Sequence, residues 1–96
     1  MIELLKLIRP LIAKGRHHYI CIAAFHLYVS GVCTRKLYTQ LEKHISSLIG
    51  YRIGLDEWLV NEGHTTWQYL STSKGRKAMR AYRLAFINHL IKQLET

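Results

Sequence analysis

The stretch YICIAAFHLYV, residues 19–29, is apolar on almost every side when it is drawn as a helix. A helix of that composition is normally covered by neighbouring elements over most of its surface. Its isoleucines, valine and aromatic residues also favour a buried strand, but its eleven residues and two consecutive alanines favour a helix. We therefore predict that residues 19–29 form the central helix of the fold, and that Ser30 and Gly31 end it.

The stretch before it has the spacing of an amphipathic helix. In residues 1–15, MIELLKLIRPLIAKG, leucine and isoleucine recur every three or four positions, which places them on one helix face. Gly15 is the expected C-terminal cap, after Lys14. Pro10 lies within the pattern, and because proline removes one backbone hydrogen bond and crowds the preceding turn, we expect a kink there or a break at Arg9.

Two helices and a connecting segment are predicted after the central helix. Thr34 is a good N-cap for a helix over residues 35–49, whose apolar residues form a stripe. LDEWL, residues 55–59, indicates a short helix that ends near Gly63. HTTWQYLST, residues 64–72, is dense in threonine and aromatic residues and could form an extended arm, but no turn dipeptide supports a hairpin. We expect a loop there.

The closing segment has the clearest pattern of the chain. From about residue 75 to residue 94, the apolar residues form two adjacent rows at helical spacing. Together with the preceding elements, this predicts a compact all-α single domain over residues 1–96, with four or five helices and the closing helix laid across the central one. Ninety-six residues hold one domain, and a chain that is 49% hydrophobic and 21% charged is unlike a disordered one.

The balance of charge indicates an acidic partner. Fourteen Lys and Arg against six Asp and Glu give a net charge of +8, which suits nucleic acid, an anionic membrane or an acidic protein surface. The two cysteines are too few for a disulfide framework, the N-terminus lacks the layout of a signal peptide, and no apolar run approaches the roughly 20 residues that span a bilayer. We expect a cytoplasmic protein with free thiols and no membrane association.

Residues 72–83, TSKGRKAMRAYR, carry the strongest functional signal. Cations gather there at the start of the closing helix, although the positive end of the helix dipole disfavours them. The arginines are spaced i, i+4 and i+7, so they lie on one helix face and point their donors where a carboxylate or phosphate can dock. The alternative is that the row only keeps a structural protein soluble. The basic residues are Lys74, Arg76, Lys77, Arg80 and Arg83.

Two aromatic residues precede this basic group. Trp67 has polar neighbours on both sides, as an exposed interface anchor has, whereas Trp58 in LDEWL is typical of a core residue. Trp67 and Tyr69 could also stack on nucleic-acid bases. No zinc-finger, RNA-binding or helix-turn-helix pattern is present, so nucleic-acid binding would be weakly sequence-specific and strongly salt-dependent.

No set of residues indicates catalysis or a metal centre. Asp56 and Glu57 are adjacent on a predicted helix and therefore point in different directions. His17, Cys21 and His26 lack the paired spacing of zinc sites, and Cys21 falls in the helix that is expected to be most buried. We expect a protein without enzymatic activity, with no catalytic residue, metal ligand or cofactor.

The segments YICIAAFHLY, GVCTRKLYTQLEKHISSLIG, LDEWL and RAYRLAFINHLIKQL follow one another over nearly the whole chain from Tyr19 onward. In this order they resemble a family of small accessory proteins carried by tailed phages and prophages. Its members typically show an ICxAL helix, a GxIT…L…I…LIG helix, a WL dipeptide and a closing R-L-A-W-(I/L)-D-x-L-I helix. Here Phe86 and Asn88 stand in place of the Trp and the Asp of the closing motif.

The resemblance implies a function that depends on binding and not on catalysis. Accessory phage proteins of this size often bind a host enzyme and block or redirect it, as do inhibitors of CRISPR effectors, of restriction enzymes and of the RecBCD nuclease. We expect a phage-encoded inhibitor that contacts a host defence or DNA-processing protein through the basic residues, with Trp67 and Tyr69 as apolar anchors. A nucleic-acid-binding accessory factor that uses the same surface is the alternative.

Overall fold

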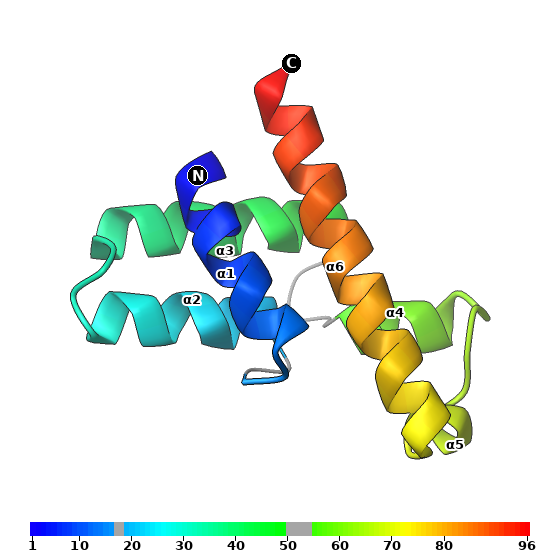
Figure 1. Cartoon of the computed structure of the whole chain (residues 1–96). Helices are drawn as coiled ribbons and strands as arrows, with labels where there is room; N and C mark the ends of the chain where they lie inside the picture. The colour runs from blue at the N-terminus through cyan, green and yellow to red at the C-terminus, as the bar shows by residue number, and fades with distance from the viewer. Residues whose placement is uncertain (17–18, 50–54) are drawn as a thin grey trace.

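A computed structural model describes residues 1–16, 19–49 and 55–96 of the chain (Figure 1). These residues form six helices and no strand, so the all-α prediction is confirmed. Five of the helices are those expected from the sequence, and the sixth is a single turn where a loop was predicted. The helices are α1 (Ile2–Ala13), α2 (Ile20–Val29), α3 (Arg35–Ile49), α4 (Leu55–Asn61), α5 (Trp67–Leu70) and α6 (Ser73–Glu95).

Helix α1 is the most deeply buried element. Its Leu4, Leu5, Ile8 and Ile12 side chains are each at most 1% exposed. The helix runs without interruption through Pro10, so of the two expected outcomes, a kink at Pro10 or a break at Arg9, the break does not occur. Pro10 is exposed, and its carbonyl still accepts a hydrogen bond of 3.0 Å from the N–H of Lys14. Burial of one whole face of α1 outweighs the single bond that proline removes.

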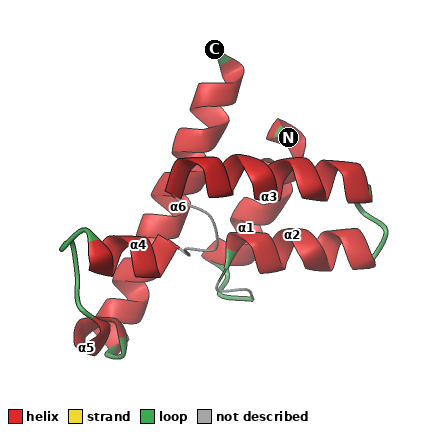
Figure 2. Cartoon of the chain, turned by 180° about the vertical axis from the view of Figure 1, so that it is seen from behind, coloured by secondary structure: helices red, strands yellow, loops and turns green. Residues whose placement is uncertain are grey.

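The helices form two layers. Helices α1 and α6 lie side by side in one layer, and the antiparallel pair α2 and α3 lies behind α1 in the other (Figures 1 and 2). The most extensive packing joins α6 to α1, and a hydrogen bond of 3.0 Å from Arg9 Nη1 to Asn88 Oδ1 links the same two helices. The closing helix therefore packs mainly on α1, whereas the sequence pattern predicted that it would lie across α2.

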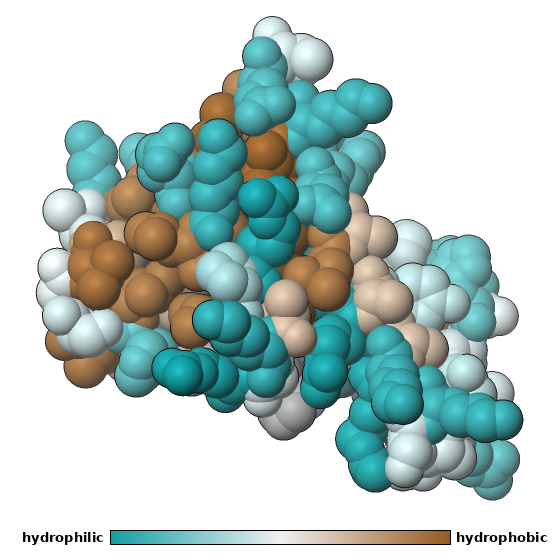
Figure 3. Space-filling model, viewed as in Figure 1, coloured by the Kyte–Doolittle hydropathy of each residue, from teal (hydrophilic) through white to brown (hydrophobic). Residues whose placement is uncertain are grey.

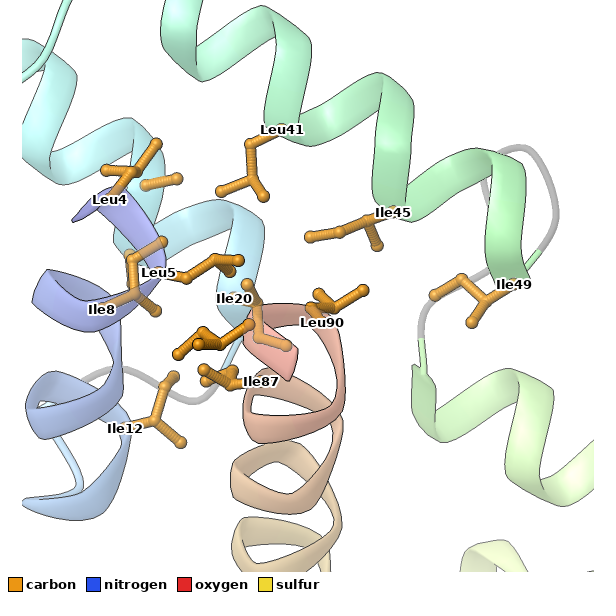
Figure 4. Close-up of a cluster of buried hydrophobic side chains, with 13 residues drawn as sticks. Leu4, Leu5, Ile8, Ile12, Ile20, Leu41, Ile45, Ile49, Ile87 and Leu90 are labelled. Carbon is orange, nitrogen blue, oxygen red and sulfur yellow. The ribbon is translucent and has the colours of Figure 1, made fainter. Parts of the chain in front are cut away.

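The apolar core fills the space where α1, α2, α3 and α6 meet (Figure 4). From α3 it receives Leu41 and Ile45, and from α6 it receives Ile87 and Leu90, of which Leu41, Ile87 and Leu90 are completely buried. Thr34 caps α3 as predicted, since its Oγ1 accepts a 3.1 Å hydrogen bond from the N–H of Leu37. This cap fixes where α3 begins and therefore which of its residues enter the core.

Helix α2 is not covered on most sides, which corrects the prediction that it is central. It buries only the face that carries Ile20, Ala23 and Ala24. Ile22, Phe25 and Val29 lie on the opposite face and are 49–65% exposed. Figure 3 shows apolar side chains gathered on the surface over the end where α2 and α3 join. The small alanines bring α1 close, but within the described residues no element covers the other face.

Candidate binding pocket

The arginine row of α6 is a continuation of the core-facing row of the same helix. Positions in one row of a helix are three or four residues apart, because a turn holds about 3.6 residues. Beyond Arg83 the next positions of the row are buried or half-buried apolar residues. The arginines therefore lie on the core-facing side of α6, where Arg83 is buried and Arg76 and Arg80 are exposed. The full row reads Arg76, Arg80, Arg83, Ile87, Leu90 and Leu94.

Helix α1 covers only the C-terminal part of this row. It ends at Ala13, and Gly15 follows in a left-handed conformation with a φ of 72°. The Arg80 guanidinium lies against this glycine, because a Cβ added there would be 2.9 Å from Arg80 Nη2. Arg80 therefore lies at the C-terminal end of α1, which is the negative end of the helix dipole.

Helix α5 covers the N-terminal end of the row. Thr66 and Thr72 cap α5 and α6 respectively, and their Oγ1 atoms accept backbone hydrogen bonds of 3.2 Å and 3.0 Å. A Cβ on Gly75 would overlap the carbonyl of Tyr69 and lie 2.7 Å from the Cα of Leu70. Only glycine allows the two backbones to approach this closely. Gly75 therefore fixes α5, and with it Trp67, against the start of α6.

A pocket of about 320 Å³ opens between α5, α6 and the first residues of α2 and α4. Three residues predicted as partner contacts, Trp67, Arg76 and Arg83, line it together. The volume is near the lower end of the range of small-molecule sites. The other described lining residues are Tyr19, Asp56, Leu70, Ser71 and Met79.

Arg83 is the buried cation of this pocket. The residue is only 8% exposed, although the sequence indicated a surface arginine. Its guanidinium carbon lies 5.0 Å from the centroid of the Tyr19 ring, a cation–π contact. Burial lowers the pKa of Arg83, while the Asp56 carboxylate and Tyr19 act in the opposite direction. An arginine remains protonated despite such a shift, so the pocket contains a permanent positive charge.

Arg76 is the exposed cation of the same pocket. Its Nη1 donates a 3.1 Å hydrogen bond to the carbonyl of Ser71, and its Nη2 lies 3.4 Å from Ser73 Oγ. These contacts hold the guanidinium over the turn between α5 and α6. Arg76 and Trp67 are therefore set on the accessible side of the pocket, and Arg83 on its buried side.

The other predicted contact residues do not enter the pocket. Tyr69 is exposed on α5, and Lys74 and Lys77 are exposed on the first turns of α6. The two lysines are about 200° and 100° from Arg76 around the helix, so they face other directions. The predicted basic group is thus divided between the pocket, the end of α1 and the outer side of α6. Figure 3 shows hydrophilic side chains over this region of the surface.

Sequence reasoning missed Tyr19 and Asp56, which reach the pocket from α2 and α4. No local pattern marks either residue, because their proximity to α6 depends on tertiary packing. The inward direction of Arg83 did have a signal. The spacing of four and three residues continues from Arg76 and Arg80 into the apolar positions of the same row.

A second basic surface lies on α3 and was also missed as a site. It is a shallow hollow lined by Arg35, Lys36, Thr39, Gln40 and Lys43. All of these residues except the half-buried Thr39 are exposed. The chain therefore carries basic side chains on two separate helices.

The part of the chain that the structure describes has no three His, Cys, Asp or Glu side chains close enough to share a metal ion. His17, considered as a ligand, lies outside the described residues. Burial raises the pKa of the Cys21 thiol to about 11, and the Glu42 carboxylate adds to this shift. The thiol is therefore protonated at neutral pH. None of the described helices is long and apolar enough to cross a bilayer.

Comparisons with known protein families, with curated proteins and with solved structures find nothing that matches this chain. Its function is therefore argued from the pocket and its surroundings.

Proposed function

We propose that this chain is an accessory protein that binds a partner protein at the mouth of the pocket, the accessible side where Trp67 and Arg76 lie. It changes the activity of the partner without catalysing a reaction. The resemblance to phage accessory proteins supplies the setting. In that setting the partner is a host defence or DNA-processing protein, such as a CRISPR effector or the RecBCD nuclease, and the protein acts in the host cytoplasm. Contact of this kind inhibits or redirects the partner by blocking a surface or by holding one conformation.

The observation that carries the proposal is the position of Trp67. Its side chain is 53% exposed, and it forms part of the wall of a pocket that also holds two arginines. Tryptophan and arginine are the residues most often found as energetic centres of protein interfaces. The Thr66 cap and the close packing at Gly75 hold the indole in one place, so it is available as a fixed anchor for a partner.

The test is an affinity capture with the tagged chain from a bacterial lysate that has been treated with nuclease and washed at moderate salt. We expect one host protein or complex to be retained in stoichiometric amount and identified by mass spectrometry. Trp67→Ala should abolish the capture, because loss of an interface anchor costs about 2 kcal/mol or more, roughly thirtyfold in affinity. Tyr82→Ala is the matched control, since Tyr82 is a similarly exposed aromatic residue on α6 outside the pocket.

Nucleic-acid binding is the second candidate, and the basic surface on α3 favours it. Arg35, Lys36 and Lys43 add cations on a helix that does not line the pocket. Binding of this kind predicts that nucleic acid is recovered before nuclease treatment, that nothing is recovered after it, and that affinity falls steeply with salt. That result, with Trp67→Ala unchanged, would contradict the protein-binding proposal.

A further inference from the structure

Arg83 presents unused donors to the pocket. A guanidinium carries five N–H donors in one plane, and within the described residues no hydrogen bond or ion pair reaches those of Arg83. Its contact with Tyr19 is through the face of the ring, at 5.0 Å, which satisfies none of these donors. Arg83 is 8% exposed, and its nitrogens are not among the fully buried polar atoms without a partner, so its free donors open into the pocket. The position favours a ligand that brings acceptor oxygens.

The charges around the pocket select for a ligand with a single negative charge. Its described lining contains two guanidinium groups, those of Arg76 and Arg83, and one carboxylate, that of Asp56. Among the described lining residues, one positive charge is therefore in excess. A carboxylate neutralises this excess, whereas a phosphate monoester brings close to two charges at neutral pH and meets repulsion from Asp56.

The position of Arg83 in the pocket favours a charged group that is carried at the end of a side chain. Arg83 lies on the buried side of a space of about 320 Å³, with Leu70 and Met79 among the apolar walls and Trp67 exposed. A carboxylate on a two-carbon stem can enter such a space. A phosphodiester of nucleic acid carries a sugar on each side, so it brings more bulk to the same space than a glutamate side chain does.

We propose that the pocket is a receptor for one glutamate side chain of a partner protein, whose carboxylate pairs with the Arg83 guanidinium while a neighbouring apolar residue of the partner packs on Trp67. Two parallel N–H···O bonds between a guanidinium and a carboxylate give both strength and a fixed orientation. Arg76 supplies a second donor from the accessible side. This inference rests on the proposed function and names the chemical group that the partner inserts.

The experiment is a titration of the full-length chain with acetyl-Phe-Glu-Phe-amide, followed by NMR of the Trp67 indole N–H and the Arg83 Nε–H. The matched probe has Gln in place of Glu and has the same shape without the charge. We expect the Glu peptide to shift both signals and the Gln peptide to bind more weakly by about tenfold to a hundredfold, as for loss of a charge-assisted hydrogen bond. Equal binding of the two peptides would overturn the proposal.

Two variants of equal charge separate the pocket from the overall positive field. Arg83→Met should abolish the difference between the Glu and Gln peptides. Arg80→Gln removes the same charge from the same row, but Arg80 does not line the pocket, so the Glu preference should be retained within about twofold. Equal loss in both folded variants, checked by thermal unfolding, would show that only net charge matters and would refute a specific carboxylate receptor.

A third variant tests the selection by charge and does not require a change at the buried arginine. A peptide with phosphoserine in place of Glu should bind the unmodified chain more weakly than the Glu peptide does, because Asp56 opposes the extra charge. In Asp56→Asn the affinity for the phosphopeptide, relative to that for the Glu peptide, should rise by about tenfold, as expected when a nearby like charge is removed. If the phosphopeptide binds the unmodified chain more tightly, the carboxylate assignment is wrong.

The outcomes also separate this inference from the proposed function. If the peptides do not bind but capture of the host protein is lost in Trp67→Ala, the chain binds a partner by the pocket mouth and the glutamate receptor is refuted. If the Glu peptide binds and no host protein is captured, the receptor stands and the proposed cellular role is wrong.

Discussion

The core-facing row of residues on helix α6 contacts different elements in the two halves of the helix. In the C-terminal half, Ile87, Leu90 and Ile91 are buried against α1 and the rest of the core. In the N-terminal half, the corresponding positions carry arginines that face the end of α1, the start of α2 and the turn before α6. One helix therefore serves as a core element along half of its length and as the wall of a charged pocket along the other half.

Helical spacing determines which residues share a face, but the neighbouring elements determine what that face does. Helix α1 is twelve residues long and covers only part of α6, which has 23 residues. Past the end of α1, the core-facing row of α6 contacts Tyr19 and the short helices α4 and α5. Arg76 and Arg83 give the pocket at this place its positive charge, and Met79 forms part of its apolar wall.

The largest expected effect is in the core half. Ile87→Ala should lower the free energy of unfolding by about 2–5 kcal/mol, because Ile87 is completely buried and the cavity adds to the lost burial. Arg80→Gln, in the pocket half of the same row, should change it by no more than about 0.5 kcal/mol. Urea denaturation of both variants checks this, and equal losses would contradict the division of α6 into two functional halves.

A smaller effect is expected where α5 meets α6. Gly75→Ala should destabilise the protein by about 1–3 kcal/mol, because its methyl group would overlap the Tyr69 carbonyl. It should also shift the Trp67 indole signal, since α5 must move away. Helix propensity alone predicts the opposite sign, a gain of up to about 1 kcal/mol for Gly to Ala. A stabilised variant with an unchanged Trp67 signal would show that the close approach of α5 is not required.

The smallest effect among the stability variants is expected at the contact between α1 and α6. Asn88→Asp would turn the hydrogen bond from Arg9 into an exposed ion pair. We expect a gain of about 0.2–1 kcal/mol at low salt that is lost at high salt. Thermal unfolding at two salt concentrations measures it, and Asn88→Ala is the control that removes the contact. A gain that persists at high salt would mean that the introduced carboxylate stabilises the protein by another route.

Much of the fold was predictable from local signals. Apolar spacing located α1, α3 and α6, and the Thr34 cap and the Ser30-Gly31 stop set the boundaries between α2 and α3. Local signals failed where tertiary contacts determine the length or the burial of a helix. Pro10 does not break α1, because the buried face of that helix outweighs one missing hydrogen bond. Helix α2 is apolar all round, yet one face is exposed, because composition does not state how many neighbours a helix has.

The candidate site was predictable only in part. The sequence named Trp67, Arg76 and Arg83, and the structure brings these three together in one pocket. It also named Lys74 and Lys77, which lie on the outer side of α6 and not in the pocket. The burial of Arg83 depends on Tyr19, which is distant in the sequence and carries no motif that relates it to α6.

The central claim is that Arg83 at its core-facing position serves to bind the carboxylate of a partner and does not serve to stabilise the fold. The most direct measurement is the thermal unfolding midpoint of Arg83→Met, a change that keeps much of the length of the side chain and removes its charge. We predict an equal or higher midpoint, because no hydrogen bond or ion pair of Arg83 within the described residues is lost, and methionine keeps the apolar packing of the side chain. A midpoint lower by more than about 8 °C, which corresponds to over 1 kcal/mol in a domain of this size, would make Arg83 a structural residue and contradict the account.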